Sequence, residues 1–495
     1  MSPVPSIAAR LEPTSFPHPV EHLQVRETAV SWLVLTGAYV YKIKKPLHLE
    51  YLDASNLERR RFLCEEELRL NRRFAPELYL EVVPIGEIEG RPVIGARGPP
   101  IEYAVRMRQF AQSEELTQSL ADGEVSSEQM AQLGAQLGEW QEAAAEAREL
   151  PFGSLSLVSS QVLGNFPDLH KGASAPEPRL TSLEAWTHRQ LTALGTLIEA
   201  RRRDGRVREC HGDLHAGNVV RWRGTWVPFD CLEFEPRLRW IDVLSDVAFL
   251  FMDLLSRERA DLAFAFLTGW LERTGDYGGL PLLRFYAVYR ALVRAKVDAL
   301  TGAAERQQQR IATADKLAHG RSIALILMHG VSASGKSWLS TRLVPALCAI
   351  RVRSDVERRR LYGRDAHSAV PDDATYERLS RCAQAALAAG LRIIVDATFL
   401  QAGRRRPYVE LARSQHCPLL VIDCQAPAHV LEARVTQRHR EAKDPSEADL
   451  AVLRGQLATA EPLSAQPGAT VIRVDTSSPH ALASMLEQIR AQLPD

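Results

Sequence analysis

The sequence predicts two domains of different class, an α+β domain followed by an α/β domain with a parallel sheet. The chain has 495 residues, which is too long for one ordinary hydrophobic core. Strand-like segments gather near the N-terminus and long helical segments follow them. After residue 320 strands and helices alternate, which is typical of a parallel sheet.

The composition is that of an ordinary globular protein, with 45% hydrophobic and 25% charged residues. The 61 basic residues balance the 61 acidic residues, so global charge indicates neither a nucleic-acid nor a membrane partner. The seven cysteines are scattered without a CxxC pair, which favours reduced thiols in a cytosol. We see neither a leader pattern nor an apolar run of about 18 residues, and we therefore expect a soluble, cytoplasmic protein.

Local patterns place the elements and the domain boundaries. The first domain is expected at 26–306, after a Pro-rich and loosely ordered lead-in at 1–25. A Gln- and Ala-rich linker is expected at 307–320, and the second domain at 321–495. The expected elements of the first domain are strands at 32–36 and 39–44, a helix at 56–73, strands within 81–107, and helices at 127–147 and 183–203.

The strongest motif is the segment Gly330-Val-Ser-Ala-Ser-Gly335-Lys336-Ser337, which has the form GxxxxGK[ST]. It follows an apolar strand at 323–328 and precedes a helix, as a phosphate-binding loop requires. Glycines let backbone N–H groups face a phosphate chain, and the helix N-terminus favours negative charge. Lys336 would reach the terminal phosphates and the Ser337 hydroxyl would bind Mg²⁺. The residues expected to hold the nucleotide here are Gly330, Ser332, Ala333, Ser334, Gly335, Lys336 and Ser337.

Residues after this loop suggest further roles, each with a simpler alternative. Asp396 ends an apolar strand and could hold Mg²⁺, or it could cap a turn. Asp355 could accept a proton from a hydroxyl, or it could be a helix N-cap. Arg434 and Arg438 could close over the γ-phosphate as a lid, or they could form a solvated helix face.

With these motifs, residues 321–495 resemble the P-loop kinases grouped with gluconate kinases, zeta toxins and polynucleotide 5′-kinases. The matching features are the loop, the segment around Asp355, the Val395–Thr398 strand end and the arginine-rich helix. The resemblance implies a P-loop NTPase domain that transfers phosphate from ATP to a hydroxyl. It implies Asp355 as general base and Arg434 with Arg438 as the lid.

A second group of residues lies in the first domain, where His211-Gly-Asp213 is followed by Asn218 and later by Asp230. A carboxylate, an Asn five residues on and a carboxylate after a short hairpin are the parts of a kinase catalytic loop and its metal site. Asp213 would orient an acceptor hydroxyl and take its proton. Asn218 and Asp230 would hold Mg²⁺, which prefers such oxygen ligands.

An upstream lysine and glutamate provide an independent check. Lys42 lies in the strand after the Gly37 turn, where it could hold the α- and β-phosphates. Glu67 shares the apolar face of the next helix with Leu63 and Leu70 and therefore needs a cationic partner. Lys42 is the expected partner, with Lys44 on the same side of the strand as the alternative, and a solvated Glu67 remains possible.

Residues 25–305 resemble the aminoglycoside phosphotransferase branch of the protein-kinase-like fold, in which HGDxxxxN replaces HRD. The resemblance implies a hinge near 102–107 that pairs with adenine, and Asp246 bonded to the catalytic loop. His211 is expected to be structural, His215 has no assigned role, and Glu233 is either a metal ligand or a surface residue. The segment 27–31 contains no glycine, unlike a phosphate-covering loop.

As a whole, the chain resembles bacterial bifunctional aminoglycoside phosphotransferase/ATP-binding proteins of the AAA ATPase type. The leading hypothesis is an ATP- and Mg²⁺-dependent phosphotransferase with two nucleotide sites and a hydroxyl-bearing, small-molecule acceptor. One alternative is 5′-hydroxyl polynucleotide kinase activity in the P-loop half, because arginines cluster there. Another is a nucleotide-sensing role in which the kinase-like half is not catalytic. The sequence predicts no oligomeric state.

Overall fold

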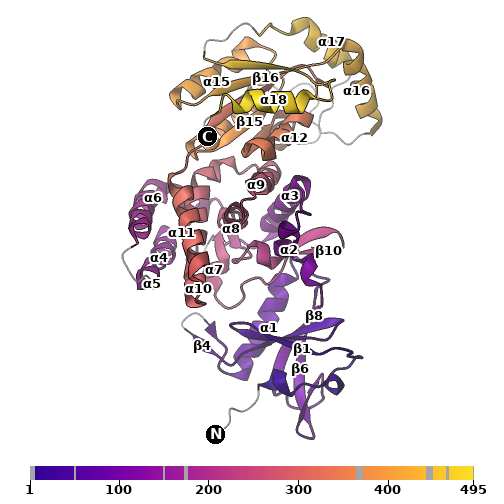
Figure 1. Ribbon diagram of the computed structural model, residues 1–495, viewed down its shortest axis with the longest axis vertical. Helices are drawn as coiled ribbons and strands as arrows, with labels where there is room; N and C mark the ends of the chain where they lie inside the picture. The colour runs from indigo at the N-terminus through magenta and orange to yellow at the C-terminus, as the bar shows by residue number, and fades with distance from the viewer. Residues whose placement is uncertain are drawn as a thin grey trace. The chain divides into compact units, whose positions relative to one another are not determined.

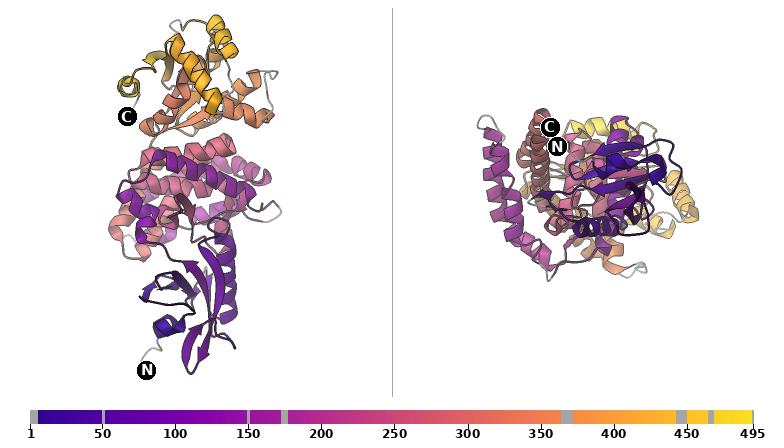
Figure 2. Two further views of the ribbon diagram at one scale, coloured as in Figure 1. Left: turned by 90° about the vertical axis from the view of Figure 1, so that its right-hand side faces the viewer. Right: turned by 90° about the horizontal axis from the view of Figure 1, so that it is seen from below.

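The computed structural model describes residues 6–49, 52–148, 151–171, 177–363, 372–441, 450–463 and 468–493, without the side chains of 372 and 438–441. The chain forms two compact units (Figures 1 and 2). Unit 1 comprises Met1–Val125, Ala143–Ser154 and Glu199–Asp246, and unit 2 comprises Ser126–Glu142, Leu155–Ile198 and Val247–Asp495. The predicted fold class is confirmed, because unit 1 is built on an antiparallel sheet and unit 2 contains a parallel one. The division at 26–306, 307–320 and 321–495 stays a prediction.

Unit 1 is organised around a six-stranded antiparallel sheet in the order β1-β2-β3-β8-β6-β7. Its strands are β1 (Gln24–Glu27), β2 (Ser31–Leu35), β3 (Tyr39–Lys44), β6 (Tyr79–Ile88), β7 (Arg91–Ile94) and β8 (Glu102–Arg108). Smaller antiparallel pairs are β4 (His48–Leu49) with β5 (Leu52–Asp53), β9 (Val207–Glu209) with β12 (Trp240–Asp242), and β10 (Val219–Trp222) with β11 (Thr225–Pro228). The helices are α1 (Leu57–Asn71), α2 (Leu116–Ala121) and α7 (Pro236–Arg239).

Strand β3 shows how the sheet presents its lysines. Side chains alternate between the two faces of a strand. Tyr41 and Ile43 are buried in the apolar core on one face, so Lys42 and Lys44 project from the other. Helix α1 contacts β3, β6 and β8 and covers the face with the lysines, since its Glu67 pairs with both of them (Figure 2).

The opposite face of the sheet is covered by the N-terminal segment. Ala8, Leu11 and Phe16 are buried against the same core as Tyr41 and Ile43. The expectation of a loosely ordered lead-in is therefore wrong for residues 6–16, which form the short 3-10 helices η1 (Ile7–Arg10) and η2 (Pro13–Ser15). Scattered apolar residues between prolines bury enough surface here to fix the segment.

The helices of unit 2 include a long antiparallel pair where a linker was expected. Residues 307–319 belong to α11 (Ala304–His319), which contacts α10 (Leu283–Leu300) and buries Ile311 and Ala314. The other helices before the parallel sheet are α3 (Ser127–Ala143), α4 (Leu155–Leu163), α5 (Phe166–Lys171), α6 (Pro178–Arg203), α8 (Val243–Ser256), α9 (Ala260–Thr274) and the 3-10 segment η5 (Tyr277–Leu282), of which α3, α6 and α8 share residues with unit 1.

The parallel sheet of unit 2 has the strand order β14-β15-β13-β16-β17. Its strands are β13 (Ala324–His329), β14 (Ala349–Arg353), β15 (Arg392–Asp396), β16 (Leu419–Gln425) and β17 (Thr470–Asp475). The accompanying helices are α12 (Lys336–Leu347), α13 (Ser354–Tyr362), α14 (Asp372–Ala388), α15 (Ala402–Ser414), α16 (Ala428–Glu441), α17 (Leu450–Thr459) and α18 (Ala481–Arg490). Every residue of β13 is buried, as expected for a central strand covered on both faces.

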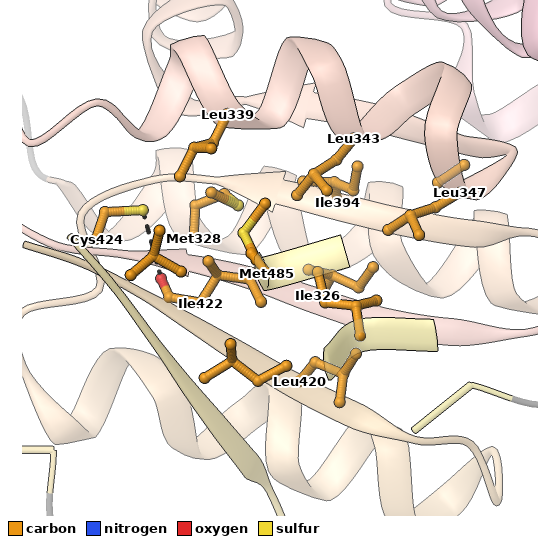
Figure 3. Packing of buried hydrophobic residues seen from close by; sticks show 14 of the residues in the cluster. Ile326, Met328, Leu339, Leu343, Leu347, Ile394, Leu420, Ile422, Cys424 and Met485 are labelled. Atoms are coloured by element: carbon orange, nitrogen blue, oxygen red, sulfur yellow. Dashed lines mark hydrogen bonds between the residues drawn. The ribbon is translucent and has the colours of Figure 1, made fainter. Parts of the chain in front are cut away.

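Figure 3 shows the core on one face of this sheet. Leu339, Leu343 and Leu347 of α12 point onto Ile326 and Met328 and their neighbours in the sheet. Their spacing of four residues places them on one side of the helix. This packing fixes the start of α12 next to the carboxyl end of β13, which is the edge where parallel sheets bind ligands.

Among the helices in the described part of the chain, none combines the length and the apolar composition that a bilayer span requires.

Candidate functional site

The first site contains a buried lysine between two carboxylates. Lys42 Nζ lies 2.7 Å from Glu67 Oε1 of α1 and 2.5 Å from Asp230 Oδ1, which follows β11. Glu67 is fully buried and Lys42 is 8% exposed. The structure therefore brings together three of the expected residues, from β3, from α1 and from the segment after β11. The alternative of a solvated Glu67 is wrong.

Lys44, two residues after Lys42 on the same face of β3, contributes to the same cluster. Its ammonium lies 2.6 Å from Glu67 Oε2 and also contacts the carboxylate of Glu233. Both lysines thus bind Glu67, and Lys42 is the one that also reaches Asp230. Glu233 is 6% exposed, so it is not the surface residue that the sequence left as one alternative.

The charges in this cluster support one another. Burial alone would lower the pKa of Lys42, but Asp230 and Glu67 outweigh it and raise that pKa well above its ordinary value. Burial alone would raise the pKa of Asp230, but the Lys42 ammonium lowers it below the ordinary value. Both groups are therefore charged at neutral pH. Asp230 also has a positive φ of 59°, a strained backbone state that is common at functional sites.

The catalytic-loop segment is held by Asp246 and His211, as the resemblance implies. The backbone N–H groups of His211 and Gly212 donate to the Asp246 carboxylate at 2.7 and 2.9 Å. The His211 ring bonds the Phe229 carbonyl through Nε2 at 2.9 Å and accepts from the Asp213 N–H through Nδ1 at 3.3 Å. Burial lowers the pKa of this ring, so His211 is a neutral bridge between the segments that carry Asp213 and Asp230.

Asn218 and His215 fix the Asp213 side of the loop. Asn218 Nδ2 donates to the Asp213 carbonyl at 2.9 Å and to Asp213 Oδ2 at 3.0 Å. His215, for which the sequence suggested no role, accepts the Gly217 N–H through Nδ1 at 3.0 Å. Its Nε2 lies 3.5 Å from Asp213 Oδ2. His215 therefore lies beside the expected acceptor-binding carboxylate.

The expected adenine hinge at 102–107 is wrong. These residues form β8, which is hydrogen-bonded to β3 on one side and to β6 on the other. Its backbone groups are therefore used by the sheet and are not available to pair with a base. Glu102 at its start is buried and ion-paired with Arg60 at 2.8 Å.

The second site begins where β13 ends. Gly330, Ala333 and Gly335 have φ values of 135°, 62° and 87°, so the backbone curls as a phosphate-binding loop requires. A Cβ at Gly330 would lie 2.5 Å from the carbonyl oxygen of Cys424, which only glycine avoids. Lys336 Nζ donates to the carbonyls of Gly330 and Val331 at 2.8 and 2.7 Å, so its side chain lies across the loop.

Two observations indicate that this loop fits phosphate. The Ser334 hydroxyl is buried at 1% exposure and has no hydrogen-bond partner within the described residues. The Ser332 N–H donates to Oε1 of Gln456 in α17 at 2.7 Å, so an acceptor oxygen already occupies that position. Gln456 is a site residue that the sequence pattern missed, because it lies 124 residues further along the chain.

Arg434 of α16 donates hydrogen bonds that hold the phosphate-binding loop in place. It donates to the Ala333 carbonyl at 3.2 Å and to the hydroxyl and carbonyl of Thr476 at 3.0 and 2.9 Å. Thr476, also missed from the sequence, donates in turn to the Ser334 carbonyl at 2.8 Å. A solvated face is therefore wrong for Arg434, and its role over a γ-phosphate stays a prediction. The side chain of Arg438 lies outside the described residues.

Asp396 ends β15 beside the first turns of α12. It is 4% exposed, and its Oδ2 accepts from the Ser340 hydroxyl at 2.8 Å. Ser340 lies one turn after the half-buried Ser337, the expected Mg²⁺ ligand. No group of three or more His, Cys, Asp or Glu side chains suited to a metal occurs in the described ranges. Magnesium bound mainly by phosphates and water needs only one or two protein oxygens, so Ser337 with Asp396, like Asn218 with Asp230, fits such a site.

Asp355 lies in the first turn of α13, directly after β14. The residue that caps this helix is Arg353, so the N-cap alternative for Asp355 is wrong. Burial raises the pKa of the Asp355 carboxyl above its ordinary value, although Arg358 and Arg353 oppose the shift. A raised pKa strengthens the carboxylate as a proton acceptor.

One family model matches part of the second half, and several relatives align with most of the chain. Residues 325–463 match the AAA domain family. Uncharacterized proteins of Mycobacterium bovis and Mycobacterium tuberculosis are 28% identical over 448 residues, which cover 85% of this chain and 88% of theirs. The predicted P-loop half is confirmed at the level of fold, because the family match, the parallel sheet and the glycine loop agree. The protein-kinase-like nature of the first half stays a prediction, which the Lys42–Glu67 ion pair supports.

Solved structures align with each half separately. A gluconokinase from Sinorhizobium meliloti is 21% identical with a TM-score of 0.27, and the alignment covers 34% of this chain and 90% of that one. A choline/ethanolamine kinase family protein from Mesorhizobium loti is 12% identical with a TM-score of 0.37, covering 60% of this chain and 88% of that one.

Proposed function

We propose that the chain is an ATP-dependent phosphotransferase with two Mg²⁺-ATP sites, each of which transfers the γ-phosphate to a hydroxyl group of a small molecule. The observation that carries the proposal is the Lys42 ammonium between Glu67 and Asp230. Burying Lys42 and Glu67 is unfavourable unless both charges are paired. A lysine fixed by a helical glutamate beside a metal-binding aspartate is the arrangement that orients a triphosphate.

In the first site the chain's own residues divide the work. Lys42 would bind the α- and β-phosphates, with Glu67 holding its ammonium in place. Asn218 and Asp230 would hold Mg²⁺, which neutralises charge on the phosphates. Asp213 would orient the acceptor hydroxyl and accept its proton, with His211 keeping the two segments in register.

In the second site most contacts to the phosphates would come from the backbone of the loop, where the first site would use side chains. The N–H groups of residues 332–337 would bind phosphate oxygens, with the Ser332 N–H exchanging Gln456 for phosphate. Lys336 would exchange the carbonyls of Gly330 and Val331 for the terminal phosphates. Ser337 and Asp396 would hold Mg²⁺. Asp355, with its raised pKa, would accept the hydroxyl proton.

Contacts within the chain weaken the alternative of a polynucleotide acceptor. Many arginines that suggested it are ion-paired with acidic residues of the same chain. These pairs are Arg351 with Glu272, Arg360 with Glu357, Arg404 with Asp373 and Arg406 with Glu410. These arginines are explained by their acidic partners without a surface that binds nucleic acid. We therefore favour a small-molecule acceptor.

Transfer of labelled phosphate tests the proposal. Wild type, Asp213→Asn and Lys336→Ala would be incubated with γ-labelled ATP and either a metabolite extract or a 5′-hydroxyl oligonucleotide. We expect labelled small molecules, and loss of a different product in each variant. Full turnover in Asp213→Asn would support the nucleotide-sensing alternative for that half, and label on the oligonucleotide would support the other alternative. Absence of any transfer or hydrolysis would contradict the proposal.

A further inference from the structure

The end of helix α9 lies against the parallel sheet, although α9 precedes that sheet's first strand by 50 residues in the sequence. Helix α9 and the sheet belong to the same compact unit, and α9 contacts α12 and β14 (Figure 1). The Nε of Arg351, in β14, donates to Glu272 Oε1 in the last turn of α9 at 2.7 Å. Both side chains are largely buried, at 9% and 19% exposure.

This ion pair continues to the expected metal ligand of the P-loop site. Arg351 donates through its NH1 group to the Ser340 hydroxyl at 3.1 Å, and that hydroxyl donates to Asp396 at 2.8 Å. The Ser340 hydroxyl has one proton, and its two acceptors are Asp396 Oδ2 at 2.8 Å and the Ser337 carbonyl at 3.3 Å, so the bond to Asp396 is the shorter one. The planar guanidinium presents a fixed set of donors, and Glu272 at Nε together with the Thr341 hydroxyl, 2.5 Å from the NH1 group, orients the edge that faces Ser340.

The position of Glu272 is itself fixed by contacts at the end of α9. Arg360 of α13 donates to the carbonyls of Glu272 and Arg273 at 2.6 and 3.1 Å, and Arg378 of α14 donates to the Gly275 carbonyl at 2.6 Å. These are carbonyls that a helix C-terminus leaves without partners, and cations there are favourable.

A tyrosine and a glycine complete this contact. Tyr277, fully buried, donates its hydroxyl to the Arg351 carbonyl at 2.7 Å. At Gly275, with φ of 68°, a Cβ would lie 2.5 Å from Nε of Arg360, so glycine allows the close approach. In addition to the Glu272 pair, four polar contacts hold the end of α9 and the residues after it: three are with arginines of α13 and α14, and one is with β14 of the sheet.

We propose that Glu272 is a positioning residue of the P-loop site, acting through Arg351 and Ser340 on the magnesium-binding carboxylate of Asp396. The proposal rests on the proposed function of that half. The residues matched by the AAA domain family, 325–463, include Arg351, Ser340 and Asp396 but not Glu272. The magnesium affinity of the P-loop site is thus set in part by a helix outside the matched domain.

The test uses the full chain with Asp230→Asn, which leaves the P-loop site as the one competent for magnesium. Binding of the non-hydrolysable analogue AMPPNP is followed by calorimetry as magnesium is varied. With Glu272→Gln we expect the half-saturating magnesium concentration to rise by about tenfold, as for other residues that orient metal ligands. Arg351→Lys keeps the positive charge but loses the planar set of guanidinium donors. It should raise the half-saturating magnesium concentration by a similar factor. Glu272→Asp should restore part of the affinity.

Glu139→Gln is the matched control. Glu139 pairs with Arg273 at the same end of α9, but it is 59% exposed, and Arg273 is not part of the chain of contacts from Glu272 through Arg351 and Ser340 to Asp396. Thermal unfolding identifies any variant that fails to fold. If Glu272→Gln fails, the magnesium midpoints of Arg351→Lys and Glu272→Asp test the inference in its place. An unchanged magnesium midpoint in Glu272→Gln would overturn the inference. Absence of magnesium-dependent AMPPNP binding in the Asp230→Asn parent would instead contradict the proposed function.

Discussion

Glu67 binds two lysines from a fully buried position, Lys42 at 2.7 Å and Lys44 at 2.6 Å. Removing one member of a buried charge cluster leaves its partners poorly compensated, which typically destabilises a protein by about 3–5 kcal/mol. Because Asp230 and Glu233 still face the two lysines, we expect Glu67→Gln to lower the free energy of unfolding by about 3 kcal/mol. Calorimetric unfolding of the full chain measures this.

The control for this prediction lies on the same helix. Glu65 is 51% exposed and pairs with Arg61 one turn away. Exposed pairs of this kind contribute little, so Glu65→Gln should leave the unfolding transition unchanged. Equal destabilisation by Glu67→Gln and Glu65→Gln would contradict the prediction. It would show that Glu67 stabilises helix α1 itself and not the buried charge cluster.

The proposed role of Asp355 as general base predicts that turnover at the second site depends on pH. Burial raises its pKa above the ordinary value, and a general base acts only when ionised. Turnover should therefore be lost, as the pH falls, at a higher pH than an ordinary aspartate would give. Arg358, 4.0 Å away, lowers this pKa, so Arg358→Gln should move the loss to still higher pH.

The measurement is the pH profile of kcat/KM for ATP turnover in an Asp213→Asn background, which isolates the second site. Asp355→Asn serves as the reference without the titrating group. A profile that is unmoved by Arg358→Gln would contradict the assignment of Asp355 as the base.

At the scale of elements, α12 positions the loop through its apolar face. Leu343 is fully buried between α12 and the sheet (Figure 3). Leu343→Ala should lower the free energy of unfolding by about 3 kcal/mol through lost burial and the cavity left behind. Thermal denaturation with and without Mg²⁺-AMPPNP would measure the loss and show whether the loop still binds.

Arg342→Ala is a suitable comparison in the same helix. Arg342 is exposed and its guanidinium lies 4.2 Å from the ring centroid of Trp338, which is itself 46% exposed. Surface substitutions of this type usually change stability by less than about 0.5 kcal/mol. A larger loss with Arg342→Ala than with Leu343→Ala would contradict the packing account.

Elements with strong local patterns could be predicted from the sequence. The strand at 39–44 coincides with β3, and its alternation correctly placed Lys42 and Lys44 on one face. The glycine pattern between an apolar strand and a helix was sufficient to find the loop at 330–337. Glu67 could be paired with a lysine because a buried carboxylate requires a cation.

Other features depend on distant parts of the chain and left no local signal. A strand at 102–107 looks the same whether it is interior or at an edge, so the hinge was misplaced. Gln456 and Thr476 meet the loop from segments more than 100 residues away. The Gln- and Ala-rich stretch at 307–320 resembled a linker because its few apolar residues face α10.

At the scale of the whole molecule, each site is drawn from one compact unit. Lys42, Glu67, Asp213 and Asp230 all belong to unit 1, whereas the loop with Asp355 and Asp396 belongs to unit 2. No residue proposed for one site is shared with the other. We therefore expect a substitution in either site to leave nucleotide affinity at the other unchanged.

Calorimetric titration of the chain with AMPPNP tests the central claim most directly, since it counts magnesium-dependent nucleotide sites. The account predicts two sites in the wild type, one in Asp230→Asn and one in Lys336→Ala, with both lost when EDTA removes magnesium. A wild-type stoichiometry of one, or binding that neither substitution changes, would contradict it.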